Sequence, residues 1–192
     1  MHCYVLLCDE CFFFLYFDHI HPTLTEPQLQ FNLVADHIMR VRRNCPQWRN
    51  SPVIIYVERN LGHEAEHHRH ALKDIPNVKF RVDAQRSRVG VLTTNETKHG
   101  MATMLNVFLR EKRVHIWKNP SIVSLDPKGA LARLNEQLHV YGYQFKGGTD
   151  TFAKDRVALS GKIGGMKDDV AIALQLGVYF TELDARNGFN LK

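Results

Sequence analysis

The segment Ser51-Pro52-Val53-Ile54-Ile55-Tyr56-Val57-Glu58 (SPVIIYVE) says most about the architecture of this chain. Ser51-Pro52 favours a turn, and Val53–Val57 is an almost unbroken run of β-branched and aromatic residues. Such a run is typical of a strand that is covered on both faces, as in a parallel sheet. Glu58 ends the run and therefore falls at the carboxyl end of the strand, the edge at which open α/β sheets place their sites.

Helical and strand patterns alternate on both sides of this segment. Helices are expected from Thr25 to Asn44, over Gly62–Lys73, over Thr94–Arg110, from Asp126 and over Lys167–Leu183. Besides Val53–Val57, strands are expected over Tyr4–Phe17 (one long strand or a tight hairpin), over Val78–Asp83, and in a hairpin of Val114–Trp117 with Ile122–Leu125. The segment Tyr141–Leu159 is expected to be irregular or weakly stranded. This alternation predicts βαβ units in a mixed, partly parallel sheet, and one α/β domain spanning residues 1–192.

Composition excludes several classes of protein. The chain has 192 residues, of which 44% are hydrophobic and 23% charged, so it is neither disordered nor fibrous. No apolar run approaches the roughly 18 residues needed to cross a bilayer, and the first residues lack the basic start of a signal peptide. We therefore expect an intracellular protein with no membrane partner and with its four cysteines reduced. Lys162 follows Gly161, but the earlier glycine and the following Ser/Thr of a P-loop are missing, which excludes a P-loop ATPase.

Three carboxylates are the main candidates for chemistry. Glu58 ends the buried strand, and Asp168 and Asp169 lie in the first turn of the last helix. Carboxylate oxygens from a strand end and a helix start are hard ligands suited to Mg²⁺ or Mn²⁺. Two such ions activate a water and stabilise the leaving oxygen of a phosphodiester. The structural alternative is that the aspartates favour the helix dipole and that the glutamate meets solvent.

Two further motifs have the residue types of zinc sites. His63-Glu64-Ala65-Glu66-His67 matches the H-E-x-x-H pattern, in which both histidines bind Zn²⁺ and Glu64 is the base. Its surroundings are polar nearly all round, and no third ligand follows at a familiar spacing, which favours a solvated helix. Cys8-Asp9-Glu10-Cys11 lacks a second ligand pair at a regular distance, so we expect buried thiols there.

Basic residues are scattered along the chain, and 25 Lys and Arg exceed 20 Asp and Glu to give a net charge of +5. Scattered bases usually solvate a surface, and a mild excess permits a polyanionic partner without requiring one. If Glu58, Asp168 and Asp169 hold metal ions, nearby cations such as Lys162 and Lys167 are needed to bring DNA phosphates to them.

The order of these motifs resembles the nuclease domain of viral terminase large subunits, closest to the herpesvirus branch. Five segments carry the likeness in order: residues 4–13 (YVLLCDECFF) resemble the family's strand "YLILxLEHFF"; 57–60 (VERN) resemble "VEGN", with Arg59 in place of Gly; 93–98 (TTNETK) resemble the threonine/lysine segment of phage terminases; 124–127 (SLDP) resemble "SFDP"; and 160–162 with 167–170 (SGK, KDDV) match "SGK…SDDL". No single motif is specific, but the ordered set covers essentially the whole chain.

The resemblance implies an RNase H-like fold that cuts concatemeric double-stranded DNA during capsid packaging. In that family three acids bind two metal ions, and Glu58 would be the second acid and Asp168 or Asp169 the third. Lys162 or Lys167 would neutralise phosphate. By the same likeness the partners would be other terminase subunits and the capsid portal, and the location would be the host nucleus.

The family's first acid has two possible sources. If Tyr4–Phe17 corresponds to the third strand of the fold, the first strand with its Asp, and the ATPase motor, would lie upstream of Met1, and the nuclease fold would be N-terminally incomplete. Alternatively, Tyr4–Cys8 is the central strand, Asp9 is the first acid and Cys11–Phe17 is the next strand of a hairpin. The likeness of Glu10–Phe13 to the third strand favours the first interpretation.

Three functions follow from these patterns. The favoured one is a two-metal endonuclease domain of a DNA-packaging terminase, which uses Glu58, Asp168 and Asp169. The second is a catalytically incomplete terminase fragment that acts in DNA binding or assembly. The third is a zinc hydrolase that uses His63, Glu64 and His67.

Overall fold

A computed structural model describes residues 2–7, 12–18, 27–44, 46–59, 64–83, 88–116, 130–146, 156–160 and 168–188 of the chain. Within these ranges the protein is mixed α/β, with five α-helices and small parallel and antiparallel sheets. The chain forms two compact units: the first comprises Met1–His19 and Thr94–Thr181, and the second comprises Ile20–Thr93 and Glu182–Lys192. None of the described helices is long and apolar enough to span a membrane.

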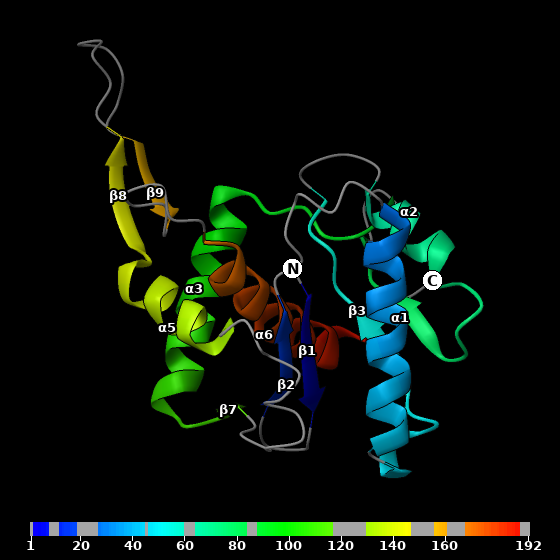
Figure 1. The fold of residues 1–192 in the computed structure, drawn as a ribbon. Helices are drawn as coiled ribbons and strands as arrows, with labels where there is room; N and C mark the ends of the chain where they lie inside the picture. The colour runs from blue at the N-terminus through cyan, green and yellow to red at the C-terminus, as the bar shows by residue number, and fades with distance from the viewer. Residues whose placement is uncertain are drawn as a thin grey trace. The chain divides into compact units, whose positions relative to one another are not determined.

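The first unit contains a three-stranded sheet in the order β1-β2-β7. β1 (His2–Leu7) and β2 (Phe12–Asp18) are antiparallel, with Leu7 opposite Phe12, so the segment predicted as one strand or a hairpin is a hairpin (Figure 1). β7 (Val114–Ile116) lies parallel to β2. Its predicted hairpin partner, Ile122–Leu125, lies outside the described residues. In the described sheet β1 lies at the edge and β2 in the middle, so β1 is not the central strand that the Asp9 alternative requires, and Asp9 itself lies outside the described residues.

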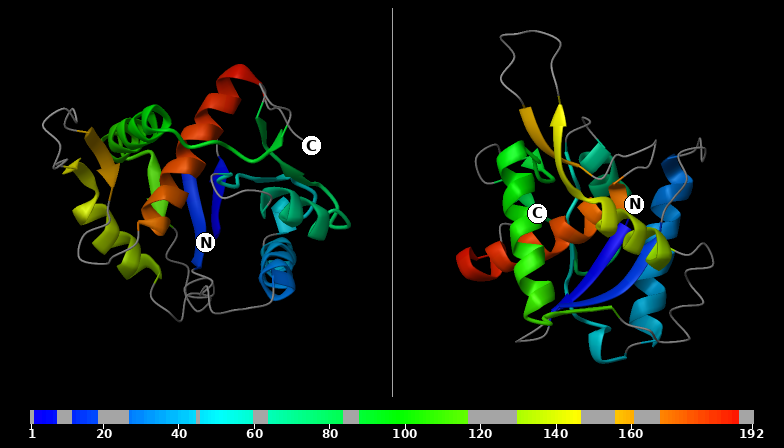
Figure 2. Two further views of the ribbon diagram at one scale, coloured as in Figure 1. Left: turned by 90° about the horizontal axis from the view of Figure 1, so that it is seen from above. Right: turned by 90° about the vertical axis from the view of Figure 1, so that its left-hand side faces the viewer.

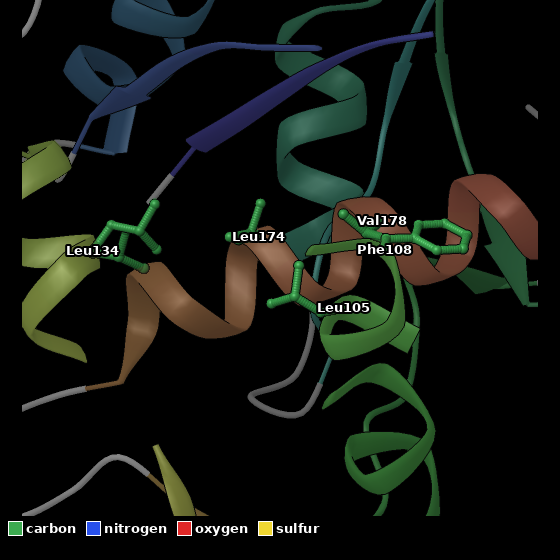
Figure 3. Packing of buried hydrophobic residues seen from close by; sticks show 6 residues of the cluster. Leu105, Phe108, Leu134, Leu174 and Val178 are labelled. Atoms are coloured by element: carbon green, nitrogen blue, oxygen red, sulfur yellow. The ribbon is translucent and has the colours of Figure 1, made fainter. Parts of the chain in front are cut away.

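Three helices complete the first unit: α3 (Asn95–Arg110), α5 (Ala130–Val140) and α6 (Asp169–Asn187), of which α6 continues into the second unit. α3 crosses α6 in the right-hand view of Figure 2. Their contact is a buried cluster formed by Leu105 and Phe108 of α3, Leu134 of α5, and Val170, Leu174 and Val178 of α6 (Figure 3). Helices were predicted over Thr94–Arg110, from Asp126 and over Lys167–Leu183, and the structure has a helix in each of these segments. α6 is buried on almost every side, which is why its sequence is apolar nearly all round.

The segment predicted to be irregular or weakly stranded forms a regular hairpin. β8 (Gly142–Lys146) and β9 (Arg156–Ser160) pair antiparallel, with Gly142 opposite Ser160 and Lys146 opposite Arg156. The hairpin is the yellow and orange pair of strands in Figure 1.

The second unit contains the expected βαβ arrangement. β3 (Val53–Ile55) lies parallel to β4 (Val78–Phe80), and α2 (Glu64–Ala71) stands between them in the chain. A second, antiparallel pair consists of β5 (Val82–Asp83) and β6 (Arg88–Val89). α1 (Pro27–Asn44), followed by the 3₁₀ turn η1 (Pro46–Trp48), contributes the buried residues Val34 and Ile38. The parallel β3–β4 pair confirms a parallel ladder for Val53–Ile55, but residues 53–57 are half-buried and not covered on both faces as the run predicted.

Candidate functional site

The chain that continues β3 toward Glu58 changes its hydrogen-bonding neighbour after Ile55. Up to Ile55, β3 pairs with β4, and the Arg81 amide then donates to the Ile55 carbonyl at 3.1 Å. The Gly90 amide in turn donates to the Arg81 carbonyl at 2.9 Å. Beyond this point the segment after β6 lies beside the continuation of β3, because the Val91 amide donates to the Val57 carbonyl and the Arg59 amide donates to the Val91 carbonyl, each at 2.8 Å.

Gly90 makes this close approach possible. Its φ is +94°, in the left-handed region that L side chains rarely adopt. A Cβ at this position would lie 3.0 Å from the Val57 carbonyl oxygen and 3.1 Å from the Cβ of Ala65 in α2. Any side chain here would push residues 91–93 away from the end of β3.

Glu58 forms a parallel bridge with Val91, and this bridge brings its carboxylate to Thr93. The Thr93 hydroxyl donates a hydrogen bond to Oε1 of Glu58. Thr93 is buried, with 8% of its surface exposed, whereas Glu58 is half-buried. A carboxylate at the end of a parallel strand pair is therefore held by a buried hydroxyl group from a segment 35 residues later.

Arg59 has a different partner from Glu58. Its Nη2 donates to Oδ2 of Asp83 at 3.0 Å, and the two side chains are 9% and 19% exposed. Consecutive residues of an extended chain point to opposite sides, so Arg59 and Glu58 face away from each other. Arg59, which stands where the "VEGN" pattern has Gly, thus makes a nearly buried ion pair on the far side of the strand from Glu58.

Asp168 and Asp169 lie at the start of a helix, as predicted from the sequence. Asp168 directly precedes α6, is 6% exposed, and its carbonyl accepts from the Ile172 amide at 2.9 Å. Asp169 is the first residue of α6, and its side chain lies outside the part of the chain that the structure describes.

Gln137 of α5 holds the first turn of α6. Its Oε1 accepts hydrogen bonds from the backbone amides of Val170 and Ala171 at 2.8 and 2.9 Å, and its side chain is only 2% exposed. These amides have no partner within the helix, so Gln137 supplies a cap from another helix. The cap fixes the backbone that carries the aspartate pair.

The candidate acids belong to different units. Glu58 is in the second unit and Asp168 in the first, so their meeting in one cleft stays a prediction. The candidate cations Lys162 and Lys167 lie outside the described residues, and so does Asp9. Among the residues that the structure describes, no three His, Cys, Asp or Glu side chains form a group that could hold a metal ion.

Only part of the H-E-x-x-H motif lies among the residues that the structure describes. His63 and the Glu64 side chain lie outside the described ranges, while His67 is exposed on α2. Its neighbour His68 is half-buried: burial lowers the pKa of His68 to about 4, and nearby positive charges, among them His67, add to the effect. His68 is therefore neutral at pH 7.

Comparison with known proteins gives no family for the chain: no protein-family model, no curated protein and no solved structure matches it. The residues that sequence reasoning missed are Thr93 as the partner of Glu58, Gln137 as a cap, and Gly90. The sequence did contain a signal for Gly90, because a glycine between two β-branched residues, here Val89 and Val91, often marks a close backbone approach. Gln137 left no local signal, because its role depends on a helix more than 30 residues away.

Proposed function

We propose that this chain is a metal-dependent endonuclease domain of the viral terminase type, with an RNase H-like fold, which cuts concatemeric duplex DNA. The observation that carries the proposal is the hydrogen bond from Thr93 to Glu58. It joins residues 57–60 and 93–98, two of the segments in which the sequence resembles terminases, at the carboxyl end of a parallel strand pair. This edge is where open α/β sheets bind their ligands.

The chemistry of the donor set fits Mg²⁺ or Mn²⁺. Glu58, Asp168 and Asp169 offer only carboxylate oxygens, which both ions prefer over nitrogen or sulfur ligands. When bound, two ions supply activation of water and stabilise charge on the phosphodiester. The chain itself contributes the three carboxylates that hold the ions, and Lys162 and Lys167 neutralise phosphate charge.

The substrate and partners belong to the same proposal. Duplex DNA suits a chain with a net charge of +5, and contacts to phosphates carry no base information, so cutting has little sequence preference. Other terminase subunits, the capsid portal and the host nucleus follow from the family resemblance alone.

A second candidate function is DNA binding or assembly by a catalytically incomplete terminase fragment. Such a fragment would keep the surface of the fold and the net charge of +5, which suit DNA, but lack the full set of metal-binding acids.

Nicking of supercoiled plasmid in Mn²⁺ separates the two candidates. For the nuclease we expect Mn²⁺-dependent cutting that is lost in Glu58→Gln, which keeps the shape of the side chain but removes its charge. Glu96→Gln, at an exposed acid in the first turn of α3, should cut like the wild type. DNA binding without cutting by clean protein would support the second candidate and reject the first. Zinc that survives dialysis and is lost in His63→Ala would instead support the zinc hydrolase.

A further inference from the structure

We infer that Thr93 is a positioning residue, which orients the Glu58 carboxylate for a divalent cation. The inference rests on the proposed function, because it assigns a role to Thr93 through the metal ligand Glu58. Its basis is the hydrogen bond from the Thr93 hydroxyl to Oε1 of Glu58 inside the second unit.

The burial of Thr93 indicates that its hydroxyl has a specific task. A buried hydroxyl loses its water and destabilises the fold unless it is hydrogen-bonded, whereas valine fills the same volume without this cost. Thr93 follows Val91 and Leu92 in an apolar run and is 8% exposed, so valine would suit the packing equally well. What threonine adds is a donor directed at the carboxylate.

A neutral donor suits a metal ligand better than a cation would. A Lys or Arg partner compensates the carboxylate charge and competes with a metal ion for it. A hydroxyl uses one of the roughly four acceptor positions of the carboxylate and leaves its full negative charge in place. Donors of this kind fix the orientation of metal ligands, and their removal typically weakens metal binding about 10- to 100-fold.

Arg59, which follows Glu58 in the chain, has a partner of its own. Arg59 points to the opposite side of the strand and is held there by Asp83 at 3.0 Å. Gly90 allows residues 91–93 to lie against the end of β3, which brings the Thr93 hydroxyl within reach of Glu58. The local backbone and the neighbouring ion pair thus both favour a hydroxyl–carboxylate pair at this edge.

Mn²⁺ binding to the full chain, measured by electron paramagnetic resonance without DNA, tests the inference. Thr93→Val removes only the hydroxyl and should raise the Mn²⁺ dissociation constant about 10- to 100-fold. Thr93→Ser keeps the hydroxyl and should stay within about threefold of the wild type. Thr97→Val is the matched control, since the Thr97 hydroxyl contacts Thr94 at 3.0 Å rather than an acid, and it should not change the constant.

Two results would contradict the role of Thr93. Wild-type affinity in Thr93→Val overturns the inference, and so does equal weakening in Thr93→Ser, because the shape of the side chain would then matter rather than its hydroxyl. If the valine variant does not fold, as judged by urea unfolding in EDTA, Thr93→Ala serves as the second hydroxyl-free variant. Wild-type protein that neither binds Mn²⁺ nor nicks plasmid rejects the proposed nuclease itself, and the role of Thr93 falls with it. Normal nicking with unchanged Mn²⁺ affinity in the hydroxyl-free variants rejects the role of Thr93 alone.

Discussion

Removing one partner of the ion pair between Arg81 and Asp184 should destabilise the second unit. Nε of Arg81 donates to both carboxylate oxygens of Asp184, at 3.1 and 2.8 Å, and the side chains are 14% and 4% exposed. Arg81 also joins the strands that lead to Glu58, since its amide donates to Ile55 and its carbonyl accepts from Gly90. Loss of Asp184 should therefore weaken the edge that carries Glu58.

Removing one partner of a buried ion pair costs about 3–5 kcal/mol, because the other charge stays buried. We expect Asp184→Ala to cost about 3 kcal/mol, at the lower end of that range, since the Arg81 side chain is 14% exposed and keeps some contact with solvent. In a protein of this size such a loss lowers the melting temperature by about 6–12 °C.

Urea unfolding followed by far-UV circular dichroism measures this loss. Arg186→Ala is the control on the same helix: it removes the partner of Glu182 that is 66% exposed and should cost at most about 0.5 kcal/mol. The double variant Arg81→Met/Asp184→Leu should recover most of the stability, because apolar side chains replace both charges. A loss below about 1 kcal/mol in Asp184→Ala, or one equal to that of Arg186→Ala, would refute this reasoning.

Three further predictions concern stability. Gly90→Ala places a Cβ 3.0 Å from the Val57 carbonyl oxygen at a φ of +94° and should cost about 1–3 kcal/mol in urea unfolding. Gly142→Ala, whose Cβ meets nothing within 4 Å, should be nearly neutral, and equal costs would contradict the steric argument. Gln137→Leu leaves two buried amides without an acceptor and should lose about 2–4 kcal/mol, whereas Gln137→Glu keeps the acceptor and should lose clearly less. Because the pKa of His68 falls from 6.5 to about 4 on folding, the unfolded chain takes up this proton first, and stability is lost as the pH drops from about 6.5 to 4. Between pH 7 and pH 4.5, the free energy of unfolding of His68→Gln should fall by about 1–3 kcal/mol less than that of the wild type. Equal decreases in the two proteins would count against the assignment.

The local elements of the fold could be predicted because their signals are local. The β-branched run of Val53–Val57 predicts a parallel strand, and β3 pairs in parallel with β4. Helical spacing predicts a helix over Thr94–Arg110, and the structure has it over Asn95–Arg110 with Thr94 as its cap. The predicted strand Val78–Asp83 instead breaks at Arg81, where the chain changes neighbours. The segment Tyr141–Leu159, predicted as irregular or weakly stranded, contains β8 and most of β9, which pair along their full lengths.

The contacts that build the candidate sites arise only in the tertiary structure. Thr93 meets Glu58 across 35 residues, Gln137 reaches the start of α6 across 33, and Arg81 meets Asp184 across 103. Periodicity and capping depend on residues within a few positions of one another, so they specify helices, strands and the end of the strand at which an acid lies. Which buried donor meets which acceptor depends on how distant segments pack, because a buried polar group must find its partner wherever the folded chain brings one within reach.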